Sequence, residues 1–244
     1  MTGEPVIAPA PRSLLLACDL QAPGTEVAAR AALSRMSAHD KERIARLTRS
    51  TDRTRSVMAR WLALQAASRF VGGPWANLRL GRHHRGRPYV MAQPRLSLSM
   101  AHSGRYAVAA VALDGLVGVD VEEITRVTAL PDSAFLTSAE SSEMSLARDD
   151  GEGRAALWVL KESAMKMTGE GLRAGMRRVS FRRRAGERFP FGAQTDYIPG
   201  AFSVTRLGGG YVCAVGVSAG IPPAASLVHA GDLREAAVAG NREE

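Results

Sequence analysis

Four side chains in two short stretches have the types and spacing to bind a cation and a phosphate. In GLVGVDVEEI (115–124), an apolar run ends in Asp120 and Glu122, which share one face of an extended chain. Two such carboxylates repel each other unless a cation or a basic group lies between them. Since Mg²⁺ prefers oxygen ligands, the pair supplies half of a cation site. The alternative is a solvated strand end, or a salt bridge to a nearby arginine.

A third acid lies on the helix predicted over residues 156–166. A core stripe with i, i+3, i+7 spacing begins at Leu157, and Glu162 lies on an adjacent face between large apolar neighbours. Lys166 follows Glu162 by one turn. The pair is either a surface ion pair, which contributes a few tenths of a kcal/mol, or an acid facing the cation and a lysine facing a phosphate.

Basic and histidine side chains gather upstream of the acidic strand. Arg87 precedes a proline that restricts its backbone, and His102 precedes a turn, where a polar loop residue is common. The basic stretch is either a solvated loop or a surface for anionic ligands. Its members are Arg79, Arg82, His83, His84, Arg85 and Arg87.

Composition favours an anionic partner. The 244 residues carry a formal net charge of +8, which suits nucleic acid, an acidic protein or a phosphorylated metabolite. Aromatic residues make up 5% and do not interleave with the basic runs, as binders of single-stranded nucleic acid require. We therefore expect no nucleic-acid partner, although a basic nucleic-acid-binding protein remains the alternative reading.

The remaining bulk features predict a cytoplasmic protein. Cys18 and Cys213 lie in apolar, strand-like stretches, so two buried free thiols are expected, as in a reducing cytosol. The apolar run at 14–18 is too short for a signal peptide, and the run at 106–113 is far too short to cross a membrane.

An α+β chain must position these side chains. We expect two similar halves, each an antiparallel sheet packed with a long helix, over residues 13–114 and 115–222. A loose arm at 1–12 and a fraying tail at 223–244 flank them. Helices are predicted at 27–47, 51–70 and 151–169, with one or two short ones in 133–147, and a basic loop or hairpin is predicted at 78–90. Strands are predicted at 13–20, 96–102, 106–113, 115–124, 179–184, 201–207 and 211–218.

The acidic strand and the Glu–Lys helix together resemble the Sfp-type 4′-phosphopantetheinyl transferases. That family has a G-[IV]-D segment and, after a gap of similar length, [FW]-x-x-K-E-[SA]-x-x-K. GRP at 86–88 and AHSGRY at 101–106 strengthen the resemblance, and the chain length suits the monomeric members. The matching residues are Gly118, Val119, Asp120, Trp158, Lys161, Glu162, Ser163 and Lys166.

The resemblance implies an activity, a cofactor and partners. It implies transfer of the phosphopantetheine arm of coenzyme A to a serine of an apo acyl or peptidyl carrier protein, with release of adenosine 3′,5′-bisphosphate. It also implies Mg²⁺, a pseudo-twofold arrangement of the halves, an active site at their interface and a monomer. The alternative within the family is a protein that binds coenzyme A or carrier protein without turnover.

The resemblance also implies residue roles. Asp120, Glu122 and Glu162 match the magnesium ligands. Glu162, as general base, and Lys166, on the pyrophosphate, match the catalytic pair. Residues expected to contact coenzyme A are Arg55, Arg87, His102, Ser103, Lys161 and Lys166, with a looser match at Ser56 and at Lys41 or Arg43.

Three further positions refine the comparison. The sequence departs from many relatives at Ala101, where they have Ser, and at Glu170, where they often have Lys. Glu123 should face away from Glu122, so we expect it to stay outside the cation site.

Overall fold

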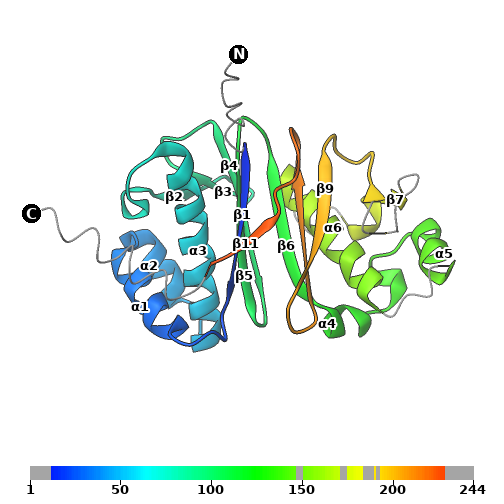
Figure 1. The fold of residues 1–244 in the computed structure, drawn as a ribbon, viewed down its shortest axis with the longest axis horizontal. Coiled ribbons are helices and arrows are strands. Elements are labelled where there is room, and N and C mark those ends of the chain that lie inside the picture. Colours follow the sequence, from blue (N-terminus) through cyan, green and yellow to red (C-terminus); the bar gives the residue numbers. More distant parts are fainter. Residues whose placement is uncertain (1–11, 147–150, 171–174, 184–189, 191–192, 229–244) are drawn as a thin grey trace, which may run out of the picture.

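Helices cover the outer faces of two central β-sheets that meet in the middle of the molecule (Figure 1). The computed structural model describes residues 12–146, 151–170, 175–183, 190 and 193–228. The predicted N-terminal arm therefore lies outside the described residues, apart from Arg12. The α+β class expected from the sequence is confirmed.

The first half of the chain builds most of a six-stranded sheet. Its strand order is β11-β1-β5-β4-β3-β2, and neighbouring strands are antiparallel except β1 and β11. The basic stretch, for which the sequence left a loop or a hairpin open, forms the β2–β3 hairpin at the edge of this sheet. The bounds are β1 Ser13–Asp19, β2 Leu80–Arg82, β3 Pro88–Val90, β4 Leu96–Ser103, β5 Tyr106–Leu113 and β11 Ala225–Leu227.

Helix α3 (Ser50–Val71) packs on the outer face of this sheet, and two shorter helices pack against α3. Helix α3 buries Trp61, Leu62 and other apolar side chains in the core beneath it. The single helix predicted over 27–47 is wrong, because the chain forms α1 (Thr25–Arg35) and α2 (Ala38–Ala45). Ser37 starts the second helix: its hydroxyl accepts a hydrogen bond from the Asp40 amide at 3.2 Å, which is an N-cap.

The second half builds a three-stranded antiparallel sheet of order β6-β10-β9, with α6 (Glu152–Thr168) on its outer face. Gly169, at φ 76°, ends α6 in the left-handed conformation. The strand predicted at 179–184 is reduced to β7. The other bounds are β6 Val117–Glu123, β9 Ala201–Leu207, β10 Tyr211–Val217, β7 Arg182–Arg183, β8 Ala193–Gln194, α4 Ile124–Thr128 and α5 Ser138–Leu146, with 3₁₀ turns at Trp75–Asn77, Asp132–Ala134 and Met176–Arg178.

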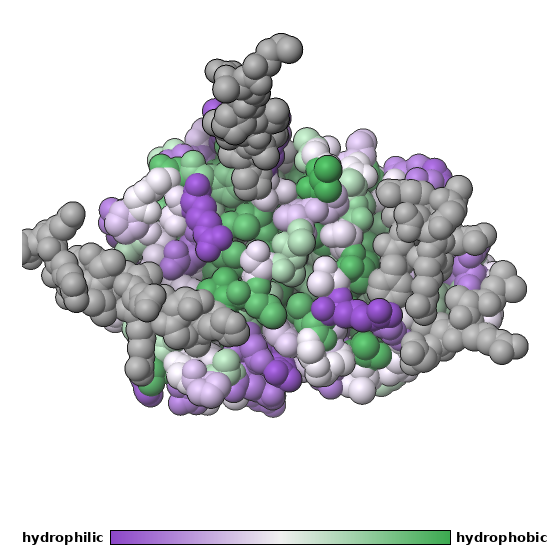
Figure 2. All heavy atoms as spheres, viewed as in Figure 1, coloured by the Kyte–Doolittle hydropathy of each residue, from purple (hydrophilic) through white to green (hydrophobic). Residues whose placement is uncertain are grey.

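A third apolar core joins the two sheets. Small and β-branched side chains of β1 and β5 pack there against those of β6 and β10. Apolar side chains also gather over the middle of the face shown in Figure 2, between more hydrophilic flanks. The two halves therefore share one interior.

The end of the described chain returns to the first sheet. Fraying after Pro223 is wrong for Ala225–Leu227, because β11 pairs with β1. Both cysteines are buried and free, as predicted. In the part of the chain that the structure describes, no helix combines the length and apolar character needed to cross a bilayer.

Candidate active site

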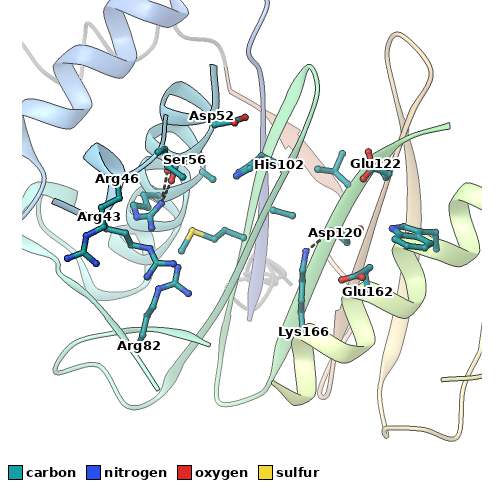
Figure 3. A pocket seen from close by; sticks show the side chains of 17 residues that line it. Arg43, Arg46, Asp52, Ser56, Arg82, His102, Asp120, Glu122, Glu162 and Lys166 are labelled. Atoms are coloured by element: carbon teal, nitrogen blue, oxygen red, sulfur yellow. Dashed lines mark hydrogen bonds and ion pairs between the residues drawn. The ribbon is translucent and has the colours of Figure 1, made fainter. Parts of the chain in front are cut away.

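A large cavity lies between the two halves, with acids on one side and arginines on the other (Figure 3). Its volume is about 970 Å³. We call Asp120, Glu122 and Glu162 the acidic wall, and Arg43, Arg46, Arg60 and Arg82 the arginine wall. The lining residues are Arg43, Arg46, Leu47, Asp52, Ser56, Ala59, Arg60, Arg82, Met100, Ala101, His102, Asp120, Val121, Glu122, Trp158, Glu162 and Lys166.

Close contact between β6 and α6 assembles the acidic wall. Asp120 and Glu122 point from β6 into the cavity, as the alternation of side chains predicts, and Glu162 reaches it from α6. A Cβ on Gly118 would come within 1.9 Å of the Ser163 carbonyl oxygen. A glycine is therefore required where the helix crosses the strand, and it brings Glu162 close to Asp120.

Lys166 partly neutralises this wall. Its ammonium donates a hydrogen bond to Asp120 Oδ1 at 2.5 Å. Burial would lower the pKa of Lys166, but the carboxylates of Asp120 and Glu162 raise it overall. The ammonium therefore stays charged at neutral pH.

The two buried acids of this wall, Asp120 and Glu162, are hard to ionise. Burial, followed by the charges of Asp120 and Glu122, raises the pKa of Glu162 to about 7, against the opposing effect of Lys166. Burial also raises the pKa of Asp120, although Lys166 opposes it. Lys166 alone therefore does not offset the mutual repulsion of the carboxylates on this wall.

Glu122 makes a different set of contacts. Its Oε1 accepts hydrogen bonds from the Ser103 hydroxyl, from the Glu123 amide at 3.0 Å and from Arg126 Nη1 at 3.3 Å. Over the described residues, no three His, Cys, Asp or Glu side chains are arranged closely enough to hold a metal ion. The structure thus brings the three predicted ligands to one cavity, with Asp120 turned to Lys166 and Glu122 turned to Arg126.

The arginine wall is assembled from α2, α3 and β2. Partial desolvation, followed by the charges of Arg43 and Arg60, lowers the pKa of Arg82 to about 10. Arg60 is nearly inaccessible and pairs with Asp40 at 3.3 Å, so α2 is tied to α3 at the base of the wall. The crowding of like charges around an open cavity favours a multiply charged anion.

His102 lies between the walls, on β4 (Figure 3). Partial desolvation, followed by the charges of Arg55 and Lys166, lowers its pKa, so the neutral imidazole is favoured. Arg55 itself is bonded to Asp52 at 2.9 Å and to the Gly104 carbonyl at 3.0 Å.

Other predicted contact residues lie near the cavity with partners of their own. Arg87 donates to the Ser97 hydroxyl at 2.6 Å and lines a second cavity of about 230 Å³ together with Lys166. Ser103 is buried and donates to Glu122. Glu123 accepts hydrogen bonds from Thr125 and Tyr211 and is directed away from the large cavity.

Lys161 is separated from the cavity, which corrects the expectation that it contacts coenzyme A. Its side chain is 0% exposed, and its ammonium donates to Glu140 at 2.6 Å and to the Phe135 carbonyl at 2.7 Å. Lys161 and Lys166 are five residues apart, so they project about 140° from each other around the helix. We assign Lys161 to the packing of α5 against α6.

Sequence reasoning missed part of the arginine wall. It gave no role to Arg46 or Arg60. It left Lys41 and Arg43 of α2 as alternatives for a contact with coenzyme A. Arg43 lines the cavity, whereas Lys41 donates a hydrogen bond to the Ser34 carbonyl. Arg60 carries a signal, because it interrupts the apolar run VMARWLAL on a buried helix. We find no comparable signal for Arg46.

Sequence comparison relates this chain to known proteins. A family model described as "4′-phosphopantetheinyl transferase, N-terminal" matches residues 23–113, and one described as "4′-phosphopantetheinyl transferase superfamily" matches residues 116–216. The two matches are adjacent, and together they cover most of the chain.

Individual relatives come from Bacillus. A 4′-phosphopantetheinyl transferase of Bacillus subtilis is 29% identical over 142 residues, which are 57% of this chain and 63% of the relative. The transferase psf-1 of Bacillus pumilus is 33% identical over 37% of this chain and 40% of its own length. The transferase Sfp of Bacillus subtilis (strain 168) is 26% identical, again over 57% and 63%. Each match spans less than two thirds of the relative's own length. Together, the two family models and these relatives show that this chain belongs to the Sfp-type 4′-phosphopantetheinyl transferase family.

Proposed function

We propose that this protein transfers the 4′-phosphopantetheine arm of coenzyme A to a serine of an apo acyl or peptidyl carrier protein. The observation that carries the proposal is one cavity with three carboxylates on one wall and four arginines on the other. Coenzyme A has a pyrophosphate and a 3′-phosphate, so it offers anionic groups to both walls. The family membership supplies the reaction class.

The basic groups bind and orient the nucleotide in this proposal. Guanidinium groups recognise phosphates through paired, charge-assisted hydrogen bonds, so the arginine wall suits a phosphate of coenzyme A. Lys166 and His102 lie between the walls, where they would contact the pyrophosphate. Arg87, which lines the second cavity, would contact the adenosine end.

Glu162 is the general base of the proposed reaction. Its place in the cavity beside Asp120 supports this role, and burial raises its pKa to about 7, near the pH at which a base is most effective. Bound Mg²⁺ would lower this pKa. The serine oxygen of the carrier forms a bond to the phosphorus that carries the pantetheine, and its proton passes to Glu162. The bond from that phosphorus to the bridging oxygen breaks, and adenosine 3′,5′-bisphosphate leaves with the electron pair.

Asp120, Glu122 and Glu162 would hold the magnesium ion that the family implies. When bound, the ion would neutralise charge on the pyrophosphate oxygens. To coordinate it, Glu122 must exchange its contact with Arg126, and Asp120 must share its carboxylate with Lys166.

The remaining parts of the proposal concern the partner and the setting. Carrier proteins are acidic, so the net charge of +8 would speed their encounter with this protein. We propose that the protein acts as a cytoplasmic monomer, without nucleic acid or membrane. The active site would lie between halves 13–114 and 115–222, related by a pseudo-twofold axis.

Intact mass spectrometry of an apo carrier protein tests the proposal. Incubation with this protein, coenzyme A and Mg²⁺ should add the mass of one phosphopantetheine, and EDTA or Glu162→Ala should remove the gain. Binding of coenzyme A without transfer to any of several carriers would point to a non-catalytic binder. The absence of both transfer and coenzyme A binding would refute the proposal. The basic cavity would then fit the nucleic-acid alternative better.

A further inference from the structure

β4 and β6 belong to different sheets but are joined by serine side chains. The Val117 amide donates to the Ser97 hydroxyl and the Val119 amide donates to the Ser99 hydroxyl, each at 3.1 Å. The other edge of β6 pairs with β10. Serine hydroxyls thus replace a backbone ladder between β4 and β6, and we call Ser97 and Ser99 the serine ladder.

The same edge of β6 continues into the acidic wall. Beyond the serine ladder, the Glu123 amide donates to Glu122 Oε1 at 3.0 Å. Ala101 is the next residue on this face of β4, and its methyl group offers no competing acceptor. Alternate amides of one strand edge therefore bond first the neighbouring strand, through Ser97 and Ser99, and then the Glu122 carboxylate.

The surroundings of the ladder make its hydroxyls important. Ser99 is 5% exposed and borders the apolar core between the sheets, where an amide without a partner costs free energy. Ser97 also accepts a hydrogen bond from Arg87 at 2.6 Å, so one hydroxyl joins a predicted nucleotide contact to the acidic strand.

We propose that Ser97 and Ser99 are positioning residues that fix β6, and with it Asp120 and Glu122, relative to β4. Neither serine needs to touch substrate. The inference rests on the proposed function for the cation site, but it concerns how that site is held. Loss of the Ser99 hydroxyl would leave the Val119 amide unsatisfied one residue before Asp120, and β6 would shift to find another partner.

The test compares Ser99→Ala with Ser218→Ala. Ser218 is a matched control because its hydroxyl also accepts an amide of the β6 segment, from Leu116 at 2.7 Å, but at the end remote from the acids. Mn²⁺ binding to the protein alone is measured by electron paramagnetic resonance, and hydrogen exchange of residues 117–123 by mass spectrometry. Ser99→Ala should weaken Mn²⁺ binding by roughly 3- to 10-fold and speed exchange over 117–123. Ser218→Ala should leave the affinity within about twofold of wild type.

The outcomes separate positioning from general stability. Restored affinity in Ser99→Thr, which keeps the hydroxyl, would support the inference. Equal losses of affinity in Ser99→Ala and Ser218→Ala, or unchanged exchange over 117–123 in Ser99→Ala, would overturn it. Failure of the wild-type protein to bind Mn²⁺ would instead count against the proposed cation site, and the exchange data would then decide the ladder alone.

Discussion

The two walls of the cavity are built in opposite ways. The acidic wall comes from one strand and one helix in direct contact, with Gly118 setting their separation and both Asp120 and Glu162 buried. The arginine wall comes from three elements, and Arg43, Arg46 and Arg82 reach the cavity from exposed positions. Rigid backbone therefore positions the acids, whereas long side chains position most of the arginines.

Two lysines of helix α6 show a second contrast, between a structural ion pair and an ion pair in the cavity. Lys161 and Lys166 are on the same helix, and each is paired with a carboxylate. The Lys161–Glu140 pair is inaccessible to solvent, whereas the Lys166 side chain is 30% exposed in the cavity. Sequence similarity alone would give both lysines the same role.

The largest expected effect comes from breaking the inaccessible pair. Lys161→Met leaves Glu140 buried without its cation, although Glu140 still accepts hydrogen bonds from the Thr137 and Phe181 amides. We expect the free energy of unfolding, measured in urea, to fall by about 3–5 kcal/mol. Lys166→Met is the matched control and should lower stability much less while impairing transfer.

A double variant sharpens this comparison. Replacing both partners, in Glu140→Leu/Lys161→Met, should recover much of the lost stability, because no charge is then left buried. Similar unfolding midpoints for Lys161→Met and the wild type would contradict a structural role for Lys161.

The next effect is a pH dependence from the acidic wall. Burial raises the pKa of Glu162 from 4.5 to about 7 in the folded protein. The contribution of Glu162 to stability is therefore fully present below pH 4.5 and is lost as the pH rises through 7. Without a divalent cation, Glu162→Gln should be more stable than wild type by about 2–3 kcal/mol at pH 8, and this gain should vanish only at about pH 4.

Urea unfolding in EDTA at several pH values measures this difference, and Mg²⁺ provides the second arm. A cation bound to ionised carboxylates should stabilise the wild type more at pH 8 than at pH 6 and should have less effect on Glu162→Gln. Parallel stability curves for the two proteins between pH 5 and 8 would show that Glu162 has an ordinary pKa.

The contrast between the walls also explains what the sequence could predict. The strand period placed Asp120 and Glu122 on one face, and the helical spacing separated Glu162 from the core stripe. Only the resemblance to the transferase family brought the three acids into one predicted site. The arginine wall depends on how α2 packs on α3, which no local period encodes. The helix break at Ser37 was missed because the surrounding run is rich in Ala and Arg, which favour a continuous helix. The role of Lys161 was misassigned because its partner Glu140 is 21 residues away in the sequence.

The smallest effect tests the arginine wall as a ligand site. Arg82→Gln removes one of the crowded charges, so we expect the KM for coenzyme A to rise roughly 10-fold with kcat changed little. Arg79→Gln is the control, since Arg79 is exposed at the start of the same hairpin and bonds the carbonyls of Ala76 and Leu78. Added salt should weaken coenzyme A binding less in Arg82→Gln than in the wild type, because fewer charges meet the phosphates. An unchanged KM in Arg82→Gln would mean that the phosphates do not reach this wall, and the acidic wall with Lys166 would then have to hold the nucleotide without it.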